Sequence, residues 1–350
     1  MERHPEEQFQ SKEKQFKYEL LPQRIYLQQK MCWAIAINHN NKFLVTGAES
    51  NINVFQFNNG EIKKIQIIQK HQSWITTLNF CNQMSLIISG SSCVKIWSQN
   101  LLSNPKCLFV LSEHSSMIQC IVYRYYNPSI IISGSRDSTI KFWYQKELQW
   151  ICQQTIKEHS NSVAALSLNQ EGNVLISCGD DHQILIIKYI DNQKWKIIQK
   201  IQGQGVRLSF ITKETFAFQS WQSNKLLLYK FEQQTGLYLK TKELQIKGSQ
   251  QFCTFLFPCV YIPSKLIFLS KNGYNLNIIR FNTSNFDGHL EQAIEFDYPN
   301  NWLGNIFGTM SEDGEYLITW DSKSKQLQIR QYKEIDLQKS TTTKKNCRIF

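Results

Sequence analysis

Residues 118–143 read IQCIVYRYYNPSIIISGSRDSTIKFW. Weaker copies of this pattern recur about every 40–50 residues along most of the chain. One unit of this size cannot bury its own apolar face, so neighbouring copies must stack into a shared core. The repeat therefore defines the architecture, and it favours a protein that holds partners over one that catalyses a reaction.

Each unit contains three short runs rich in Ile, Val, Phe, Leu and Tyr, separated by Gly, Asn, Asp and Ser. Such runs predict β-strands, and no stretch keeps a helical period. A fourth, more variable run follows most units. The first runs of the seven units are WAIAI (33–37), WITTLNF (74–80), IQCIVY (118–123), VAALSL (163–168), VRLSF (206–210), FCTFLF (252–257) and NIFGTM (305–310).

Seven groups of four strands predict an all-β fold, a seven-bladed β-propeller of four-stranded antiparallel blades around a channel. About 45 residues per blade, taken seven times, leaves only short tails on a chain of 350 residues. A sandwich or a barrel is the alternative for a chain of this length, but neither explains the repeat.

The stretch SGSRDSTIKFW (133–143) resembles the signature of WD-repeat propellers. The resemblance implies a hydrogen-bonded brace made of a His before the blade, a Ser ending its second strand, an Asp in the next turn and a Trp in the third strand. The third unit carries all four, as His114, Ser133, Asp137 and Trp143. Such buried polar groups must satisfy one another, and the chain of bonds fixes the turn.

The neighbouring units keep part of this set. The second unit lacks the Asp, and the fourth has Ile187 where the Trp would stand. The brace residues that they retain are His71, Ser89 and Trp97 in the second unit and His159, Ser177 and Asp181 in the fourth. The resemblance covers about residues 30–332 and is strongest in units two to four. The dipeptide Trp320-Asp321 aligns with the end of a second strand, so it is not the family's Trp-Asp pair.

A propeller must close, because an open sheet edge is a liability. The run RIYLQQ (24–29) precedes the first unit and has no blade of its own, so we expect it to supply the outer strand of the last blade. The competing candidate is EIDLQ (334–338). The predicted organisation is a flexible polar tail at 1–18, a propeller at 19–333 and a basic tail at 334–350.

Composition restricts the class of protein. No apolar run is long enough to span a membrane, and the N-terminus is polar, without the apolar stretch of a signal peptide. The ten Cys include no Cys-x-x-Cys pair, so we expect free thiols in a reducing compartment and no zinc site. These features favour a cytoplasmic protein, with the nucleus as the alternative.

Catalytic motifs are lacking: the sequence holds no Gly-x-Ser-x-Gly, phosphate-binding loop or His-Glu-x-x-His. Asp180-Asp181-His182 is the densest titratable cluster, but Asp181 aligns with the bracing Asp137. We therefore expect no catalytic residue, no metal and no cofactor.

A repeated position gives the best functional signal. The residue three after the brace His is Trp74 in the second unit and Met117 in the third, and Trp33 and Trp302 align with them. This position precedes the innermost strand, and the resemblance implies that the channel rim there is the usual partner-binding face. Since units seven, one and two are adjacent in a closed ring, the three Trp predict an aromatic arc, unless they fold inward as packing. The other residues expected on this face are Arg136, His182, Arg207 and Trp221.

These observations predict a non-catalytic scaffold that docks proteins or peptide motifs on its rim. The net charge of +11 supports an alternative, a subunit of a nucleic-acid or ribonucleoprotein complex. A second alternative is an enzyme with a site at the channel mouth.

The last four residues, Cys347-Arg-Ile-Phe, resemble a prenylation box, in which a terminal Phe favours geranylgeranylation. Lipidation at Cys347 would anchor the chain to a membrane with help from Lys344 and Lys345. Intact-mass measurement of the native protein distinguishes the two states: a mass increase of one isoprenoid group supports the anchor, and an unmodified terminus excludes it.

Overall fold

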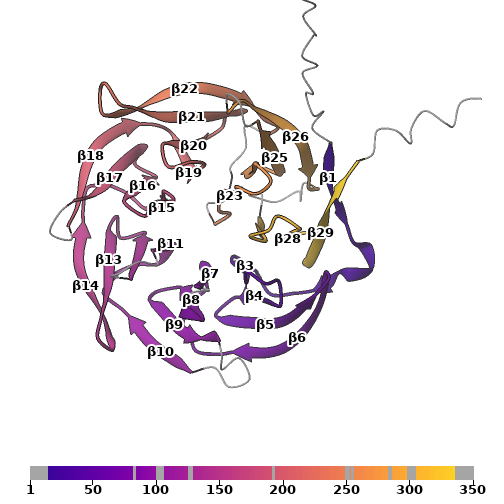
Figure 1. Ribbon diagram of the computed structural model, residues 1–350. Coiled ribbons are helices and arrows are strands. Elements are labelled where there is room, and N and C mark those ends of the chain that lie inside the picture. Colours follow the sequence, from indigo (N-terminus) through magenta and orange to yellow (C-terminus); the bar gives the residue numbers. More distant parts are fainter. Residues whose placement is uncertain are drawn as a thin grey trace, which may run out of the picture.

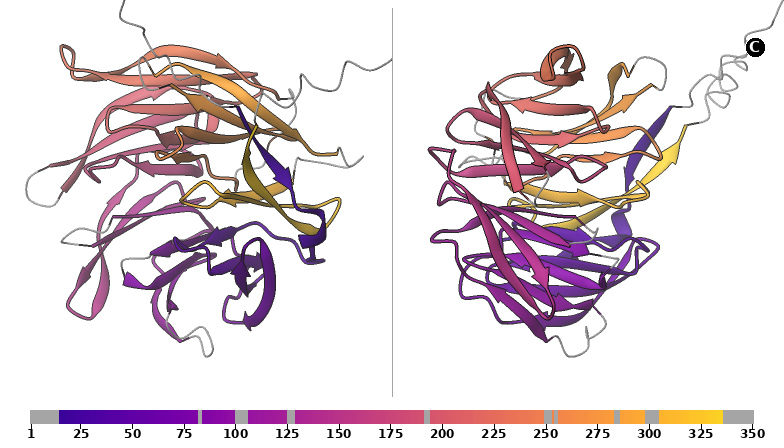
Figure 2. Two further views of the ribbon diagram at one scale, coloured as in Figure 1. Left: turned by 45° about the vertical axis from the view of Figure 1, so that its right-hand side comes forward. Right: turned by 60° about the vertical axis from the view of Figure 1, so that its left-hand side comes forward.

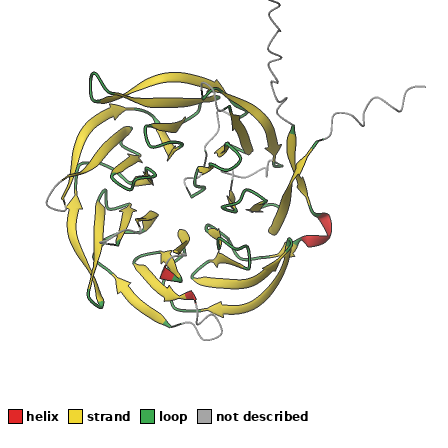
Figure 3. Cartoon of the chain, in the orientation of Figure 1, coloured by secondary structure: helices red, strands yellow, loops and turns green. Residues whose placement is uncertain are grey.

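The computed structural model describes residues 15–81, 84–99, 106–124, 129–190, 194–248, 253, 256–282, 286–297 and 305–335. Within them, seven antiparallel sheets are arranged in a closed ring around a central channel (Figure 1). Nearly all of the described chain is strand or loop (Figure 3), and a 3-10 turn, η1, lies at Pro22–Arg24. The predicted all-β, seven-bladed propeller is confirmed.

The blades follow the order of the chain. Blade one comprises β3 (Ile35–Ile37), β4 (Phe43–Ala48), β5 (Asn51–Asn58) and β6 (Glu61–Ile68). Blade two comprises β7 (Thr77–Cys81), β8 (Leu86–Gly90), β9 (Val94–Ser98) and β10 (Cys107–Leu111). Blade three comprises β11 (Ile118–Arg124), β12 (Ile130–Ser135), β13 (Ile140–Lys146) and β14 (Gln149–Ile156). Blade four comprises β15 (Val163–Leu168), β16 (Val174–Gly179), β17 (Gln183–Ile190) and β18 (Lys194–Gln202). Blade five comprises β19 (Gly205–Phe210), β20 (Thr215–Ser220), β21 (Lys225–Glu232) and β22 (Leu237–Gln245). Blade six comprises β23 (Val260–Ile262), β24 (Ile267–Asn272), β25 (Asn275–Phe281) and β26 (Gly288–Glu295). Blade seven contains β27 (Ile306–Met310), β28 (Tyr316–Asp321) and β29 (Gln326–Glu334).

The apolar core lies between the blades. Within each blade the first strand faces the channel and the fourth lies outermost (Figure 1), so the two faces of every sheet press against neighbouring sheets. Between blades one and two, for example, Val54 and Ile52 pack with Ile87 and Trp97 in one cluster. This two-sided burial explains why most second strands, such as β8, β12, β16 and β28, are buried along their whole length rather than at alternate residues.

The outer strands carry a repeated irregularity. In six of the seven blades the register shifts between the third strand and the outermost one. A bulge of this kind bends and twists the outer strand, which makes its open edge a poor template for another chain. The shifts lie at Val54/Phe55, Cys107/Phe109, Phe142/Trp143, Ile186/Ile187, Leu228/Tyr229 and Ile278/Ile279.

The predicted inner strand of blade six is wrong. The strand is β23, Val260–Ile262, and not the run 252–257, of which only Cys253, Leu256 and Phe257 are described. Pro258 lies between the two segments and has no N–H to donate to a ladder, so strand pairing begins after it.

The ring closes through an N-terminal strand, as predicted, but through a different segment. Strand β1 (Phe16–Leu20) forms the outer strand of the last blade and pairs with β29 along its whole length (Figures 1 and 2). Of the predicted run 24–29 only β2 (Tyr26–Leu27) pairs with β29, over two residues. Strand β1 thus begins at Phe16, before the expected boundary at Glu19 and inside the segment taken as a flexible tail.

The competing C-terminal segment does not take this place. Strand β29 ends at Glu334. The backbone N–H of the next residue, Ile335, donates to the carbonyl of Gln15 at 2.7 Å. Residues 336–338 of that candidate, and Cys347, lie outside the described residues.

Two aromatic side chains hold β1 in the ring. Phe16 and Tyr18 are both 2% exposed, and the Phe16 ring stacks on Tyr332 with centroids 4.9 Å apart. The Tyr18 hydroxyl donates to the carbonyl of Gly314 at 2.6 Å. Phe16 and Tyr18 are buried on either side of the exposed Lys17, as expected for a strand with one face in the core.

Replacing Tyr18 by Ala should destabilise the propeller by about 3 kcal/mol or more, because it removes a buried ring and a hydrogen bond. Lys17→Ala is the matched control on the same strand, since Lys17 forms only an exposed ion pair with Glu19. Chemical denaturation measures both. Equal stability of the two variants would mean that β1 does not hold the ring closed.

Candidate functional site: the rim face

One face of the ring is built from two kinds of loop. In blades one, three, four, five and seven, the loop before the innermost strand meets the turn between the second and third strands through a backbone hydrogen bond. Arg136 N–H donates to the Met117 carbonyl at 2.9 Å, and Trp221 N–H donates to the Gln204 carbonyl at 2.7 Å. We call this surface the rim face.

The brace in blade three is complete. His114 Nε2 lies 2.8 Å from Ser133 Oγ, and His114 Nδ1 lies 2.8 Å from a carboxylate oxygen of Asp137. Trp143 Nε1 donates to the same Ser133 hydroxyl at 2.9 Å. Asp137 also accepts from the backbone N–H of Ser115 at 2.9 Å, which ties the leading loop to the turn.

Blades two and four hold partial versions of this brace. In blade four, His159 lies 2.9 Å from Ser177 Oγ and 2.9 Å from Asp181, while Ile187 fills the place of the Trp. In blade two, His71 Nε2 lies 2.7 Å from Ser89 Oγ, which also accepts from Trp97 Nε1 at 2.8 Å. The residues in these contacts are the ones that the sequence analysis named for the brace: His71, Ser89, Trp97, His159, Ser177 and Asp181.

The missing Asp has an electrostatic consequence in blade two. His71 Nδ1 is buried and has no hydrogen-bond partner among the described residues. Burial, together with the charge of Lys95, lowers the pKa of His71 to about 4. Burial also lowers the pKa of His114 and His159, but there Asp137 and Asp181 oppose it.

Blade one uses a glutamine where the braced blades use a histidine. Gln28 is buried, and its Oε1 accepts from Thr46 Oγ1 at 2.8 Å and from Asn53 Nδ2 at 3.0 Å. Its backbone carbonyl accepts from Trp320 Nε1 at 3.0 Å, which joins the last blade to the first. Sequence reasoning missed Gln28, since a Gln in a polar run carries no signature.

Two of the three predicted arc tryptophans are in contact. The rings of Trp33 and Trp74 meet edge to face, with centroids 4.3 Å apart, and Trp74 is 43% exposed. Trp302 lies outside the described residues. An exposed aromatic pair on a loop offers a rigid apolar contact to a partner.

A second, polar group lies across blades three to five. Arg136 is exposed on the turn of blade three, and its charge acts on Asp180 of blade four. His182 lies beside Trp221, with ring centroids 6.2 Å apart. Met117 is half-buried at the position equivalent to Trp74.

Arg207 does not belong to this surface, contrary to expectation. It is 2% exposed, and its Nε donates to the carbonyl of Phe257 at 3.0 Å, in blade six. In β19 the register shifts between Gly205 and Arg207, so that Arg207 pairs with Gln219 of β20. In β11 an equivalent shift precedes Cys120, which pairs with Gly134 of β12. Such a side chain points toward the next blade and not into solvent.

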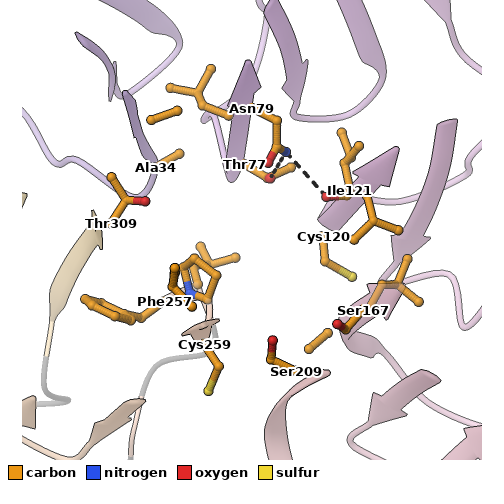
Figure 4. Close-up of a pocket in the computed structure, with 18 of the residues that line it drawn as sticks. Ala34, Thr77, Asn79, Cys120, Ile121, Ser167, Ser209, Phe257, Cys259 and Thr309 are labelled. Carbon is orange, nitrogen blue, oxygen red and sulfur yellow. Dashed lines mark hydrogen bonds between the residues drawn. The ribbon is translucent and has the colours of Figure 1, made fainter. Parts of the chain in front are cut away.

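The channel is uncharged along most of its wall. It forms a cavity of about 450 Å³ lined by the innermost strands. Figure 4 shows small polar side chains around it, among them Thr77, Asn79 and Ser167, and the Asn79 amide donates to Thr77 and to the carbonyl of Ile121. Among the described residues of this wall, the charged ones are Arg207 and Glu312.

The described residues contain no group of three or more His, Cys, Asp or Glu placed to hold a metal ion. Asp181 of the densest titratable cluster is bonded to His159 instead. No described helix is long and apolar enough to cross a membrane.

Several described lysines form ion pairs with carboxylates in different blades. These ion pairs include Lys200–Glu158, Lys225–Glu243, Lys242–Asp287, Lys265–Glu315 and Lys323–Asp297.

The model of the WD domain, G-beta repeat, matches residues 62–98, 105–144 and 150–188. The chain contains three consecutive WD repeats within a seven-bladed propeller. Each matched segment runs from the outermost strand of one blade through the first three strands of the next, such as β10 to β13. This offset explains why the ring needs a strand from the N-terminus.

Several WD-repeat relatives are similar to parts of the propeller. The nuclear distribution protein PAC1 of Komagataella phaffii is 30% identical over 34% of this chain. The DENN domain and WD repeat-containing protein SCD1 of Arabidopsis thaliana is 27% identical over 37% of it, and the p21-activated protein kinase-interacting protein 1-like of Xenopus laevis is 35% identical over 20%. The chain spans 26%, 10% and 18% of the lengths of these relatives.

Acid should destabilise the propeller through His71. The pKa of His71 is about 6.5 in the unfolded chain and about 4 in the folded protein. Between these two pH values the unfolded state binds more protons than the folded state, so the free energy of unfolding falls as the pH falls. From about pH 7 to about pH 5 this amounts to about 2 kcal/mol. The substitution His71→Gln should remove that part of the pH dependence.

The matched control is His289→Gln, because His289 is an exposed residue of β26. Denaturant unfolding at both pH values measures the effect. The pH dependence of the control should equal that of the wild type, and a His71→Gln variant with the same dependence would contradict the assignment.

Proposed function

We propose that this propeller is a non-catalytic scaffold that docks partner proteins or peptide segments on its rim face. The contact between Trp33 and Trp74 carries the proposal, because it places a partly exposed aromatic pair at the junction of blades one and two. Aromatic side chains are enriched among the residues that dominate binding energy at interfaces.

The brace supports this role by making the rim rigid. In blades two to four, buried hydrogen bonds fix the loop that precedes the innermost strand. A loop that is already ordered loses little entropy when a partner binds, so more of the contact energy appears as affinity. Rigid strands with varied loops are a common way to present binding residues.

The alternatives receive less support from the described residues. A nucleic-acid subunit would be expected to gather unpaired cations on one face. Several described lysines are instead paired with carboxylates in different blades, among them Lys200, Lys225 and Lys265. An enzyme at the channel mouth would need converging titratable groups, and the described channel wall is mainly apolar and small polar. The relatives include a protein kinase-interacting protein by name, which is consistent with a binding role.

The double substitution Trp33→Ala and Trp74→Ala should abolish capture of partner proteins while the ring stays folded. Loss of a central aromatic anchor costs about 2 kcal/mol or more, which is about thirtyfold in affinity. Affinity purification of tagged wild type and variant from the same lysate, with identification of the captured proteins, measures the loss.

Leu148→Ala is the control, since Leu148 is 85% exposed in the turn between β13 and β14, on the face opposite the rim. This variant should capture the wild-type set. If the Trp double variant captures the same proteins as the wild type, the aromatic pair is only structural. If the captured set instead depends on nucleic acid and is lost steeply as salt is added, the result would favour the nucleic-acid alternative.

A further inference from the structure

Glutamine side chains join the outer strands of neighbouring blades. Gln154 of β14 donates through Nε2 to the carbonyl of Trp195 in β18 at 2.7 Å, and its Oε1 accepts from the backbone N–H of the same residue at 2.9 Å. Gln199 of β18 makes the same two contacts with Tyr238 of β22, at 2.9 and 2.8 Å. One side-chain amide thus binds both backbone groups of one residue in the next blade. We call this contact a glutamine clamp.

A third glutamine clamp lies where the ring closes. Gln292 of β26 accepts from the N–H of Tyr18 at 2.7 Å and donates to the carbonyl of Tyr18 at 3.2 Å. The clamps therefore join blade three to four, blade four to five and blade six to seven. The clamped residue is a buried aromatic each time: Tyr18, Trp195 and Tyr238.

The clamp has one register position. Each clamping glutamine pairs with the last residue of the third strand before the register shift, and a bulge redirects the side chains beside it. These pairs are Phe142–Gln154, Ile186–Gln199 and Ile278–Gln292. In blade five this position holds Lys242, which forms an ion pair with Asp287 just before β26. In blade one it holds Gln66, whose counterpart in blade two precedes β10, outside the described residues.

The junction between blades two and three lacks the glutamine. Phe109 of β10 stands at the clamp position. Trp150 of β14 stands where Trp195 stands in β18, since each pairs with the end of its third strand, at Gln145 and Tyr189. A phenyl ring offers no amide to the backbone of Trp150, so the outer strands of these two blades are not clamped.

Buried polar groups are also left unpaired at this junction. A small cavity lies between the two blades, lined by Leu86 of blade two and by Trp150 and Arg124 of blade three. Trp150 Nε1 and Arg124 Nε are buried and have no hydrogen-bond partner among the described residues. At the clamped junction of blades three and four, Trp195 Nε1 donates to Tyr144 Oη at 3.1 Å. A buried donor without a partner costs stability, so the unclamped junction is the weaker one.

The hydrogen bonds that join blades two and three lie near the rim. The N–H of Ile118 donates to the carbonyl of Ser91 at 2.8 Å, and Thr76 Oγ1 donates to the carbonyl of Ile118. Thr76 and Ile118 lie where the rim loops enter β7 and β11. The cavity lies at the opposite ends of these blades, beside Cys81 and Ile130. The junction is thus bonded at one end and poorly satisfied at the other.

We propose that the junction of blades two and three is a seam that opens locally while the rest of the ring stays folded. The seam opens on the face opposite the rim, with the bonds of Ser91, Thr76 and Ile118 as its hinge. The glutamine clamps keep the junctions that carry them closed. Proteins open first where local stability is lowest. Since the rim stays in place, the seam does not rest on the proposed docking function, and all of its tests use the protein without a partner.

Hydrogen exchange tests the seam directly. The intact protein carries isotope-labelled tryptophan, and NMR follows the backbone and indole N–H of each residue. The indole N–H of Trp150 should exchange about tenfold faster than that of Trp195, or more, because solvent reaches it when the seam opens. Equal protection of the two indoles in the wild type would overturn the proposal.

A pair of matched variants tests the clamp. Gln154→Met keeps the length of the side chain but removes two hydrogen bonds, so the backbone N–H of Trp195 should exchange about tenfold faster or more. Gln153→Met is the control, because Gln153 is exposed on the same strand. It should exchange like the wild type. If Gln154→Met does so too, the clamps do not hold their junctions closed.

The converse variant adds an amide to the seam. Phe109→Gln places a glutamine at the clamp position next to Trp150, and the Trp150 N–H groups should then exchange more slowly. Unchanged exchange in the folded variant would show that the missing clamp does not cause the opening. If this variant does not fold, the wild-type comparison and the thiol measurement below still decide.

Thiol labelling separates local opening from unfolding of the whole ring. Cys81 is 2% exposed and lines the cavity of the seam, whereas Cys178 is 0% exposed in the clamped junction of blades four and five. Iodoacetamide labelling of both is measured by mass spectrometry at urea concentrations below the unfolding transition. Local opening exposes little surface, so the rate at Cys81 should change little with urea while the rate at Cys178 rises steeply. An equally steep rise at Cys81 would overturn the proposal.

Discussion

The propeller depends on the pairing of β1 with β29, which joins the two ends of the ring. Without this ladder the last blade would have three strands and an open edge, and the contact between blades seven and one would lose its cover. Phe16 and Tyr18 secure the strand by burial, and the indole of Trp320 secures the following segment at Gln28. The closure is made by side-chain packing as well as by backbone hydrogen bonds.

Closure also determines what the rim presents. Each brace bonds a leading loop to a strand of its own blade, so the loop position is set by the sheet and not by the loop itself. Trp33 and Trp74 come from adjacent blades and touch only because those blades are pressed together in the ring. The proposed docking surface is thus a property of the assembled ring and not of a single repeat.

The junctions between blades are not equivalent. Gln154, Gln199 and Gln292 bind the backbone of the next blade's outer strand, so three junctions have hydrogen bonds in addition to side-chain packing. Between blades two and three, Phe109 stands at this position, and Trp150 Nε1 is buried without a hydrogen-bond partner among the described residues. This difference is the physical reason for expecting the ring to open there first.

The sequence by itself determined the repeat, the strand content, the seven blades and the brace residues, because these depend on local patterns that each unit repeats. Tertiary structure alone decided that Phe16–Leu20 closes the ring, that Gln28 takes the place of a brace histidine, that β23 begins after Pro258 and that Arg207 is buried. Each of these depends on contacts between distant parts of the chain or on a register shift of one residue, which reverses the direction of a side chain.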